Sequence, residues 1–288
     1  MWEGESALRG HAENVRSLSL NTQTSERIHW AVDWLFKLQV SCCLEELSVA
    51  YVGQGWPSPT AIDHYQPTFK LGPFSNQLHA VSLKKLYADW TECTFDRLCV
   101  LKLSDINTLD ADSFAHILAT SPMLQVLELT RVRLSSRLES ELVIPPNLKS
   151  LRLCCISGYP LGYILQVLAP GTYNIKLYVD KVSFLDSNVR RPKFRDRISK
   201  MTHAIRQITH NITVLGVGCD VDILGPVLIA VAVTLPNLTN LRLEDVELFR
   251  SGLAGIEDMI KKLPHIKTVQ VTLARVADIG SFKDVIQR

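Results

Sequence analysis

The chain has 288 residues, of which 47% are apolar and 21% charged, values that are typical of a globular protein and exclude a disordered one. A formal net charge of +2 gives no general attraction to nucleic acid or to a membrane surface, so neither is expected as a partner. The first residues contain no signal-peptide run, and the longest uncharged apolar run, 223–235, is too short to cross a bilayer. We therefore expect an intracellular protein of the cytoplasm or the nucleus.

One nine-residue phrase recurs ten times along the sequence. It reads Leu-x-x-Leu-x-Leu, followed by two free positions and a ninth residue that is usually apolar. Leu, Val or Ile fills the first, fourth and sixth positions of every copy, with Thr172 as the exception. The copies start about 28 residues apart, a period typical of leucine-rich repeats, and they begin at Val15, Leu44, Leu78, Leu98, Leu124, Leu148, Thr172, Ile212, Leu238 and Ile266.

This phrase predicts an α/β fold, a leucine-rich-repeat solenoid that bends into a horseshoe. The first, fourth and sixth residues of each phrase would turn into a core, while the third and fifth would face outward. Because one repeat cannot bury its own apolar face, the repeats must stack, and about ten strands would form a parallel sheet on the concave side. A single domain covering 1–288 is expected, with helices or irregular segments on the convex side.

Several segments between the phrases have the apolar spacing of amphipathic helices. The predicted helices cover 25–40, 110–120, 195–210 and 256–263. Prolines shortly before the phrases at 124, 148, 238 and 266 end the preceding segment and lead the chain into the next strand. The ninth position lacks the Asn with which regular repeats satisfy the backbone of their loops, so uneven loops are expected.

Two intervals are longer than the others and predict irregular insertions near 52–77 and 181–200. The first is rich in Gly and Pro and indicates a surface loop, packed by Trp56, Tyr65 and Phe69. The second contains the basic run 190–200. That run is typical either of a nuclear-import or polyanion-binding site or of a solvated loop that leads into the next helix.

No motif in the sequence indicates catalysis. A glycine-rich phosphate loop, a nucleophile elbow and a zinc-protease helix are all missing. The seven cysteines include no Cys-x-x-Cys pair, which argues against a metal site, and we expect them to be reduced thiols. The sequence therefore predicts no enzymatic activity, no cofactor and no catalytic or metal-binding residue.

The outward fifth positions form the candidate partner-binding surface on the concave face. In a parallel sheet they would line up about 5 Å apart on adjacent strands. Cations beside exposed aliphatic groups suit an acidic protein or peptide partner, and Glu128 would set its register by repelling a misplaced acid. The alternative is that these charges serve solubility alone. The candidate residues are Lys102, Glu128, Arg152, Lys176 and Arg242.

The phrases at 15–20 (VRSLSL), 124–129 (LQVLEL) and 235–243 (LPNLTNLRL) resemble the repeat region of fungal F-box proteins, and the resemblance extends from Arg9 to the end. In that family an F-box domain binds the Skp adaptor of a cullin–RING ubiquitin ligase, and the repeats select substrates. The residues before Val15 contain no Leu-Pro-x-Glu helix start. The resemblance thus implies substrate binding, and adaptor binding only if an F-box lies upstream.

Two functions remain open at this point. The first is the substrate-recognition module of an F-box ubiquitin-ligase receptor. The second is a free-standing leucine-rich-repeat protein that binds or inhibits a partner without any ligase role. A GTPase activator is disfavoured, because activators of this architecture use regular repeats that carry Asn.

Overall fold

Each repeat phrase forms one β-strand, and within each unit of the chain neighbouring strands pair in parallel. The computed structural model divides the chain into two units, Met1–Leu148 and Lys149–Arg288. It describes residues 14–23, 43–53, 69–86, 88–90, 92–106, 109–134, 145–154, 156, 161, 164, 174–180, 212–218, 235–244, 247–248, 261, 266–272 and 275–276.

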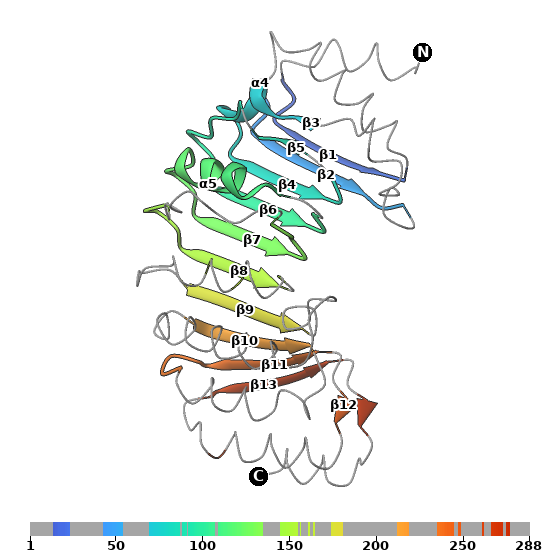
Figure 1. Cartoon of the computed structure of the whole chain (residues 1–288), viewed down its shortest axis with the longest axis vertical. Helices are drawn as coiled ribbons and strands as arrows, with labels where there is room; N and C mark the ends of the chain where they lie inside the picture. The colour runs from blue at the N-terminus through green and yellow to red at the C-terminus, as the bar shows by residue number, and fades with distance from the viewer. Residues whose placement is uncertain are drawn as a thin grey trace. The chain divides into compact units, whose positions relative to one another are not determined.

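Five parallel strands follow one another in the first unit in the order β1-β2-β4-β6-β7 (Figure 1). In their register, residues at the same position of neighbouring phrases lie opposite each other. Ser48 thus lies opposite Ser82, and Lys102 lies opposite Glu128. The strands are β1 (Ser17–Thr22), β2 (Glu46–Tyr51), β4 (Ala80–Lys84), β6 (Val100–Ser104) and β7 (Val126–Thr130).

The second unit contributes five further strands in the order β8-β9-β10-β11-β13 (Figure 1). A separate pair of short strands, β12 (Glu247–Leu248) and β14 (Arg275–Val276), is also parallel. The five strands are β8 (Ser150–Cys154), β9 (Asn174–Asp180), β10 (Ile212–Gly218), β11 (Asn240–Glu244) and β13 (Thr268–Thr272).

These strands confirm the leucine-rich-repeat fold predicted from the sequence. Nine of the ten begin at the third position of their phrase, and only β10 begins at the first, Ile212. The first, fourth and sixth positions turn inward as expected, since Leu98, Leu101 and Leu103 are fully buried. Burial of one leucine side chain contributes roughly 1.5–3 kcal/mol, so these rows of leucines supply the main apolar stabilisation of the repeats.

The helix predicted at 110–120 forms as α5 (Ala111–Ala119). Asp110 caps its first turn, because its carboxylate accepts a hydrogen bond of 2.9 Å from the backbone N–H of Ser113. Phe114 and Ile117 are buried in the core. At the other end the buried Ser121 hydroxyl donates to the carbonyl of Ile117 at 2.6 Å, which satisfies one carbonyl of the last turn.

Part of the interval expected as a surface loop is ordered. β3 (Phe69–Lys70) pairs with β5 (Ala88–Asp89), and the short helix α4 (Gly72–Ser75) follows β3. The buried Ser75 hydroxyl donates to the carbonyl of Gly72 at 2.8 Å and accepts from the N–H of Thr94 at 3.0 Å. These elements are too short to show an apolar period, which is why the sequence did not predict them.

Three strands of the first unit are each followed directly by a residue with a left-handed backbone. Lys85, Asp105 and Arg131 have φ values of 54°, 55° and 51°, and each occupies the eighth position of its phrase. This conformation costs an ordinary residue roughly 1–2 kcal/mol. The repeats lack the usual Asn, and a left-handed residue turns the chain out of the strand at this point instead.

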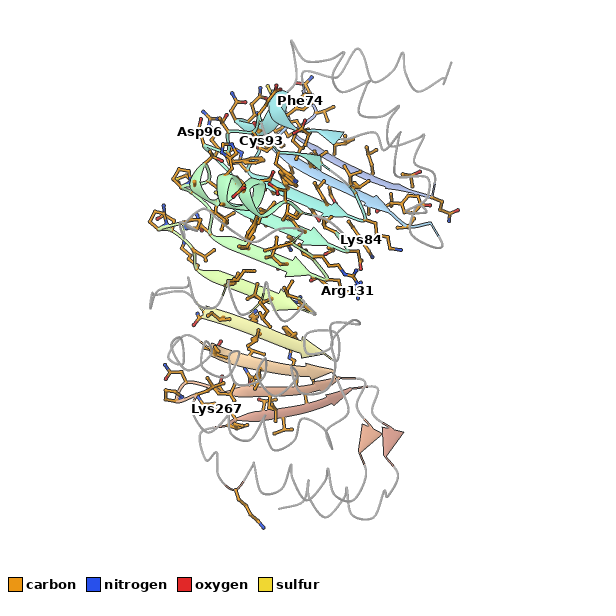
Figure 2. The ribbon with its side chains drawn as sticks, in the orientation of Figure 1. Phe74, Lys84, Cys93, Asp96, Arg131 and Lys267 are labelled. Carbon is orange, nitrogen blue, oxygen red and sulfur yellow. The ribbon has the colours of Figure 1, made fainter. Side chains whose placement is uncertain are left out.

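An ion pair joins two of these strand exits. The Asp105 carboxylate, which is 5% exposed, accepts two hydrogen bonds from Arg131, one of them from Nη2 at 3.0 Å. Burial by itself raises the pKa of Asp105, but the hydrogen bond and charge of Arg131, with the charges of Lys84 and Lys85, outweigh it and lower the pKa below its usual value. Lys84 and Arg131 lie at the same end of their strands (Figure 2).

Several other predictions fall outside the described residues. They are the helices at 25–40 and 195–210, the loop aromatic residues Trp56 and Tyr65, the insertion at 181–200 and its basic run. Of the predicted helix 256–263 only Lys261 is described, and it is helical.

Candidate functional site

In each unit the side chains at the third, fifth and seventh positions of the phrases lie on the same face of the sheet. We call this face the open face. Along β6 their side chains are half-buried, at Val100, Lys102 and Ser104, and they alternate with fully buried leucines. The apolar residues of α5 are buried with those leucines in the core. A partner can therefore contact the open face without disturbing the packed core.

In the first unit the charges of the open face balance, with two acids, Glu46 and Glu128, and two cations, Lys84 and Lys102. Its fifth-position row has the predicted register and consists of Ser19, Ser48, Ser82, Lys102 and Glu128. The Lys102 Nζ lies 3.5 Å from Oε1 of Glu128, with side chains 45% and 28% exposed. Such a surface ion pair contributes at most about 1 kcal/mol. It nevertheless places an opposite charge beside each of these two side chains.

In the second unit the predicted row is broken between β9 and β10. Arg152 lies opposite Lys176 as expected, but Lys176 then lies opposite Val214. Gly216, which was expected beside Lys176, lies opposite Tyr178. The predicted alignment of the fifth positions is therefore wrong by two residues at this step. The seven residues of β9 accommodate both registers, and the pairing is irregular between Ile212 and Val214.

This shift places Arg242 in the same row as Tyr178. Gly216 pairs with Tyr178 on one side and with Arg242 on the other. The Tyr178 ring lies over Gly216, where an added Cβ would come within 2.1 Å of the ring carbon Cδ1. The ring therefore crosses β10 at a position that has no side chain. Its hydroxyl accepts a hydrogen bond of 3.0 Å from Nη1 of Arg242.

Two arginines contact this ring. The guanidinium carbons of Arg152 and Arg242 lie 5.0 and 5.9 Å from the centroid of Tyr178, which is 6% exposed. A cation–π contact of this kind contributes about 0.5–2 kcal/mol. We call Arg152, Tyr178 and Arg242 the arginine–tyrosine cluster.

The cluster carries positive charge without a matching acid. Neither arginine forms an ion pair within the part of the chain that the structure describes. The Arg152 Nε is buried and has no hydrogen-bond partner there. An unpaired buried donor costs about 1–3 kcal/mol. Packing on the aromatic ring holds this guanidinium in place.

The five candidate residues thus fall into two groups. Lys102 and Glu128 form a pair in the first unit, while Arg152, Lys176 and Arg242 belong to the second. Tyr178 and Gly216 were not among the predicted site residues. Gly216 was a usable signal, because a glycine inside a strand often marks the close approach of another group.

Other reactive groups in the described residues do not form a second site. No cluster of three or more His, Cys, Asp or Glu side chains that could hold a metal ion occurs among them. None of the described cysteines, Cys43, Cys93, Cys99 and Cys154, forms a disulfide bond. Burial, with the charges of Asp89 and Glu92, raises the pKa of Cys93 to about 12. Within the same residues no helix is long and apolar enough to span a membrane.

Comparison with known proteins finds likeness only among solved structures. No protein-family model matches the chain, and no curated protein matches it. The chain is similar to the crystal structure of the leucine-rich repeat-containing protein LegL7 from Legionella pneumophila, with 10% identity and a TM-score of 0.44. The match covers 94% of this chain and 89% of that one. The repeat architecture rests on the strands of the chain itself.

Proposed function

We propose that this chain is a protein-interaction scaffold, and specifically a substrate-recognition module like the repeat arm of an F-box ubiquitin-ligase receptor. The observation that supports the proposal is the open face of the second unit. There Arg152, Lys176 and Arg242 have no ion pair among the described residues. Uncompensated cations on a partly exposed surface favour a partner with acidic residues. The proposal involves no catalytic step, no cofactor and no metal.

A protein or peptide suits this face better than a small ligand. The open face of the first unit carries half-buried aliphatic side chains, such as Val100 opposite Val126. Hydroxyl groups lie beside them at Ser82 and Ser104. A mixture of apolar contacts with a polar surround is typical of protein–protein interfaces. The whole chain, 1–288, is proposed to act as one repeat domain.

A photocrosslinker built into the chain tests this proposal. Benzoylphenylalanine would replace Ser82 or Asn240 on the open face and, as matched controls, Asp112 or Lys261, which are exposed and lie on helices. We expect one partner to be captured from both open-face positions and from neither control. Capture from the helix positions alone would contradict the proposal.

A free-standing binding or inhibitor protein is the alternative, and it would use the same open face. The two functions differ in whether the Skp adaptor is bound. The measurement is co-precipitation of the adaptor with the product of the longest transcript of the gene, together with the lifetime of the captured partner. Adaptor binding and a shortened partner lifetime support the ligase role. A bound partner without adaptor, and with an unchanged lifetime, supports the free-standing protein.

A further inference from the structure

We infer that the arginine–tyrosine cluster is a carboxylate-binding site, and that its natural ligand is a Glu or Asp side chain of a protein partner. That the carboxylate comes from a protein partner rests on the proposed function. That the site binds a carboxylate rests on the positions of Arg152, Tyr178 and Arg242 alone.

Two donors of the cluster, the Arg242 guanidinium and the Tyr178 hydroxyl, lie together. Because this oxygen accepts a hydrogen bond from Nη1 of Arg242 at 3.0 Å, its own O–H proton is free to be donated to another acceptor. Arg242 retains further N–H groups beside it. A carboxylate can accept the tyrosine proton on one oxygen and an arginine N–H on the other, and such charge-assisted hydrogen bonds are short and strong.

The positive charge at this point lacks a counter-ion. Arg152 and Arg242 both lie within cation–π distance of one ring, at 5.0 and 5.9 Å from its centroid. Two like charges beside the same group repel each other, and a bound anion relieves that repulsion. The unpartnered, buried Nε of Arg152 is an independent sign, since no acid in the described residues accounts for the position of this arginine.

The ring is also fixed before any ligand arrives. Tyr178 is 6% exposed and lies over Gly216, so its hydroxyl has little freedom to turn away. A donor set that is already in place loses less conformational entropy when it binds. The two-residue shift between β9 and β10 therefore builds a rigid site that a regular repeat would not have.

The charge of the surrounding strands favours a carboxylate over a phosphate dianion. The strands β8, β9, β10, β11 and β13 carry three cations, Arg152, Lys176 and Arg242, against two acids, Asp180 and Glu244, which leaves a net charge of +1. Both acids occupy the last position of their strand. One monoanion matches this balance, whereas a dianion would exceed it.

The test is a titration of the full chain, labelled with 15N at arginine, and followed by NMR at constant ionic strength. The probe is the tripeptide acetyl-Ala-Glu-Ala-amide, and its control is the same peptide with Gln in place of Glu. The Arg242 Nε–H signal is assigned by its loss in Arg242→Lys. We expect a saturable shift of this signal with the Glu peptide and none with the Gln peptide.

Three variants sharpen the test. Tyr178→Phe keeps the ring but removes the hydroxyl. It should lower the affinity for the Glu peptide by about tenfold or more, because one hydrogen bond to a charged group is lost. Arg152→Gln should also lower the affinity for the Glu peptide. Lys267, which is labelled in Figure 2, is an exposed residue of the same unit that does not belong to the cluster, so Lys267→Gln should leave the affinity unchanged. An unchanged affinity in Tyr178→Phe would overturn the inference.

The remaining outcomes of the titration also support or overturn the inference. Tighter binding of inorganic phosphate than of the Glu peptide would overturn the carboxylate assignment and point to a phosphorylated segment. A shift that grows linearly and equally with both peptides would mean that no site exists. Saturation by the Glu peptide without any crosslink from the open face would leave the site standing and reject the scaffold. A crosslink from the open face without saturation by the Glu peptide would reject the carboxylate site and leave the scaffold standing.

Discussion

Gly216 on β10 lies beneath the ring of Tyr178 on β9, so close that an added Cβ would come 2.1 Å from the ring. This one contact explains why a glycine stands inside a central strand. It also explains how a tyrosine on β9 reaches an arginine on β11, two strands away. The pair is the structural basis of the arginine–tyrosine cluster.

Gly216→Ala should therefore destabilise the second unit by about 1–3 kcal/mol, because the new methyl group overpacks against the ring. Urea unfolding measures the free-energy change. In a Tyr178→Ala background the same substitution should cost much less, since the clash has been removed. An equal cost in both backgrounds would show that the ring does not lie over the glycine.

Leu127→Ala should cost about 2–5 kcal/mol, because the side chain occupies the fourth position of a central phrase and is 4% exposed. Its loss leaves a cavity that the neighbouring leucines cannot fill. Met123→Ala, three residues before the strand and 45% exposed, is the matched control and should change the urea midpoint little. Similar losses in both variants would contradict the assigned register.

Asp105→Asn should destabilise the first unit near neutral pH by breaking the ion pair with Arg131, while Asn still tolerates the left-handed backbone. The folded-state pKa of Asp105 is lowered, so the contribution of its charge is fully present above the unfolded value, about 3.9, and is lost as pH falls through the folded pKa. Unfolding measured from pH 7 down to pH 3 should show the difference between variant and wild type shrinking only at the acid end. A difference that does not change with pH would exclude the ion pair as its cause.

Cys93 should resist alkylation in the folded protein. Burial and the charges of Asp89 and Glu92 raise its pKa to about 12, so almost no thiolate exists near pH 8, and the residue is fully buried. The exposed Cys43 is the internal control. Mass spectrometry after iodoacetamide treatment should find Cys43 modified and Cys93 unmodified until urea is added. Rapid modification of both residues would contradict the burial of Cys93.

The sequence predicted the strands well, because their cause is local and repeated. A phrase with three apolar positions identifies a strand directly in the sequence. In nine of ten cases the strand begins at the third position of its phrase. The helix after Asp110 was equally readable, since the cap and the apolar face both lie in one short segment. The left-handed turns at the eighth position were not predicted, because Lys85 and Arg131 are residue types that rarely adopt them.

The candidate site could be predicted only in part. The sequence identified Arg152 and Arg242 as outward cations, but a constant phrase implies a constant register, and the register changes between β9 and β10. That change depends on packing between residues 38 positions apart, Tyr178 and Gly216. Nor could the sequence show that Lys102 is neutralised by Glu128, since this follows from the distance between two side chains.

The affinity of the crosslinked partner for two matched triple variants tests the central claim most directly. In the first, Arg152, Lys176 and Arg242 are replaced by Gln. In the second, the same number of charges is removed from exposed lysines off the open face, Lys149, Lys261 and Lys267. We predict that the first variant binds at least about tenfold more weakly, a loss of about 1.4 kcal/mol, while the second binds like the wild type and both remain folded. A first variant that is folded and binds as tightly as the wild type would contradict the account.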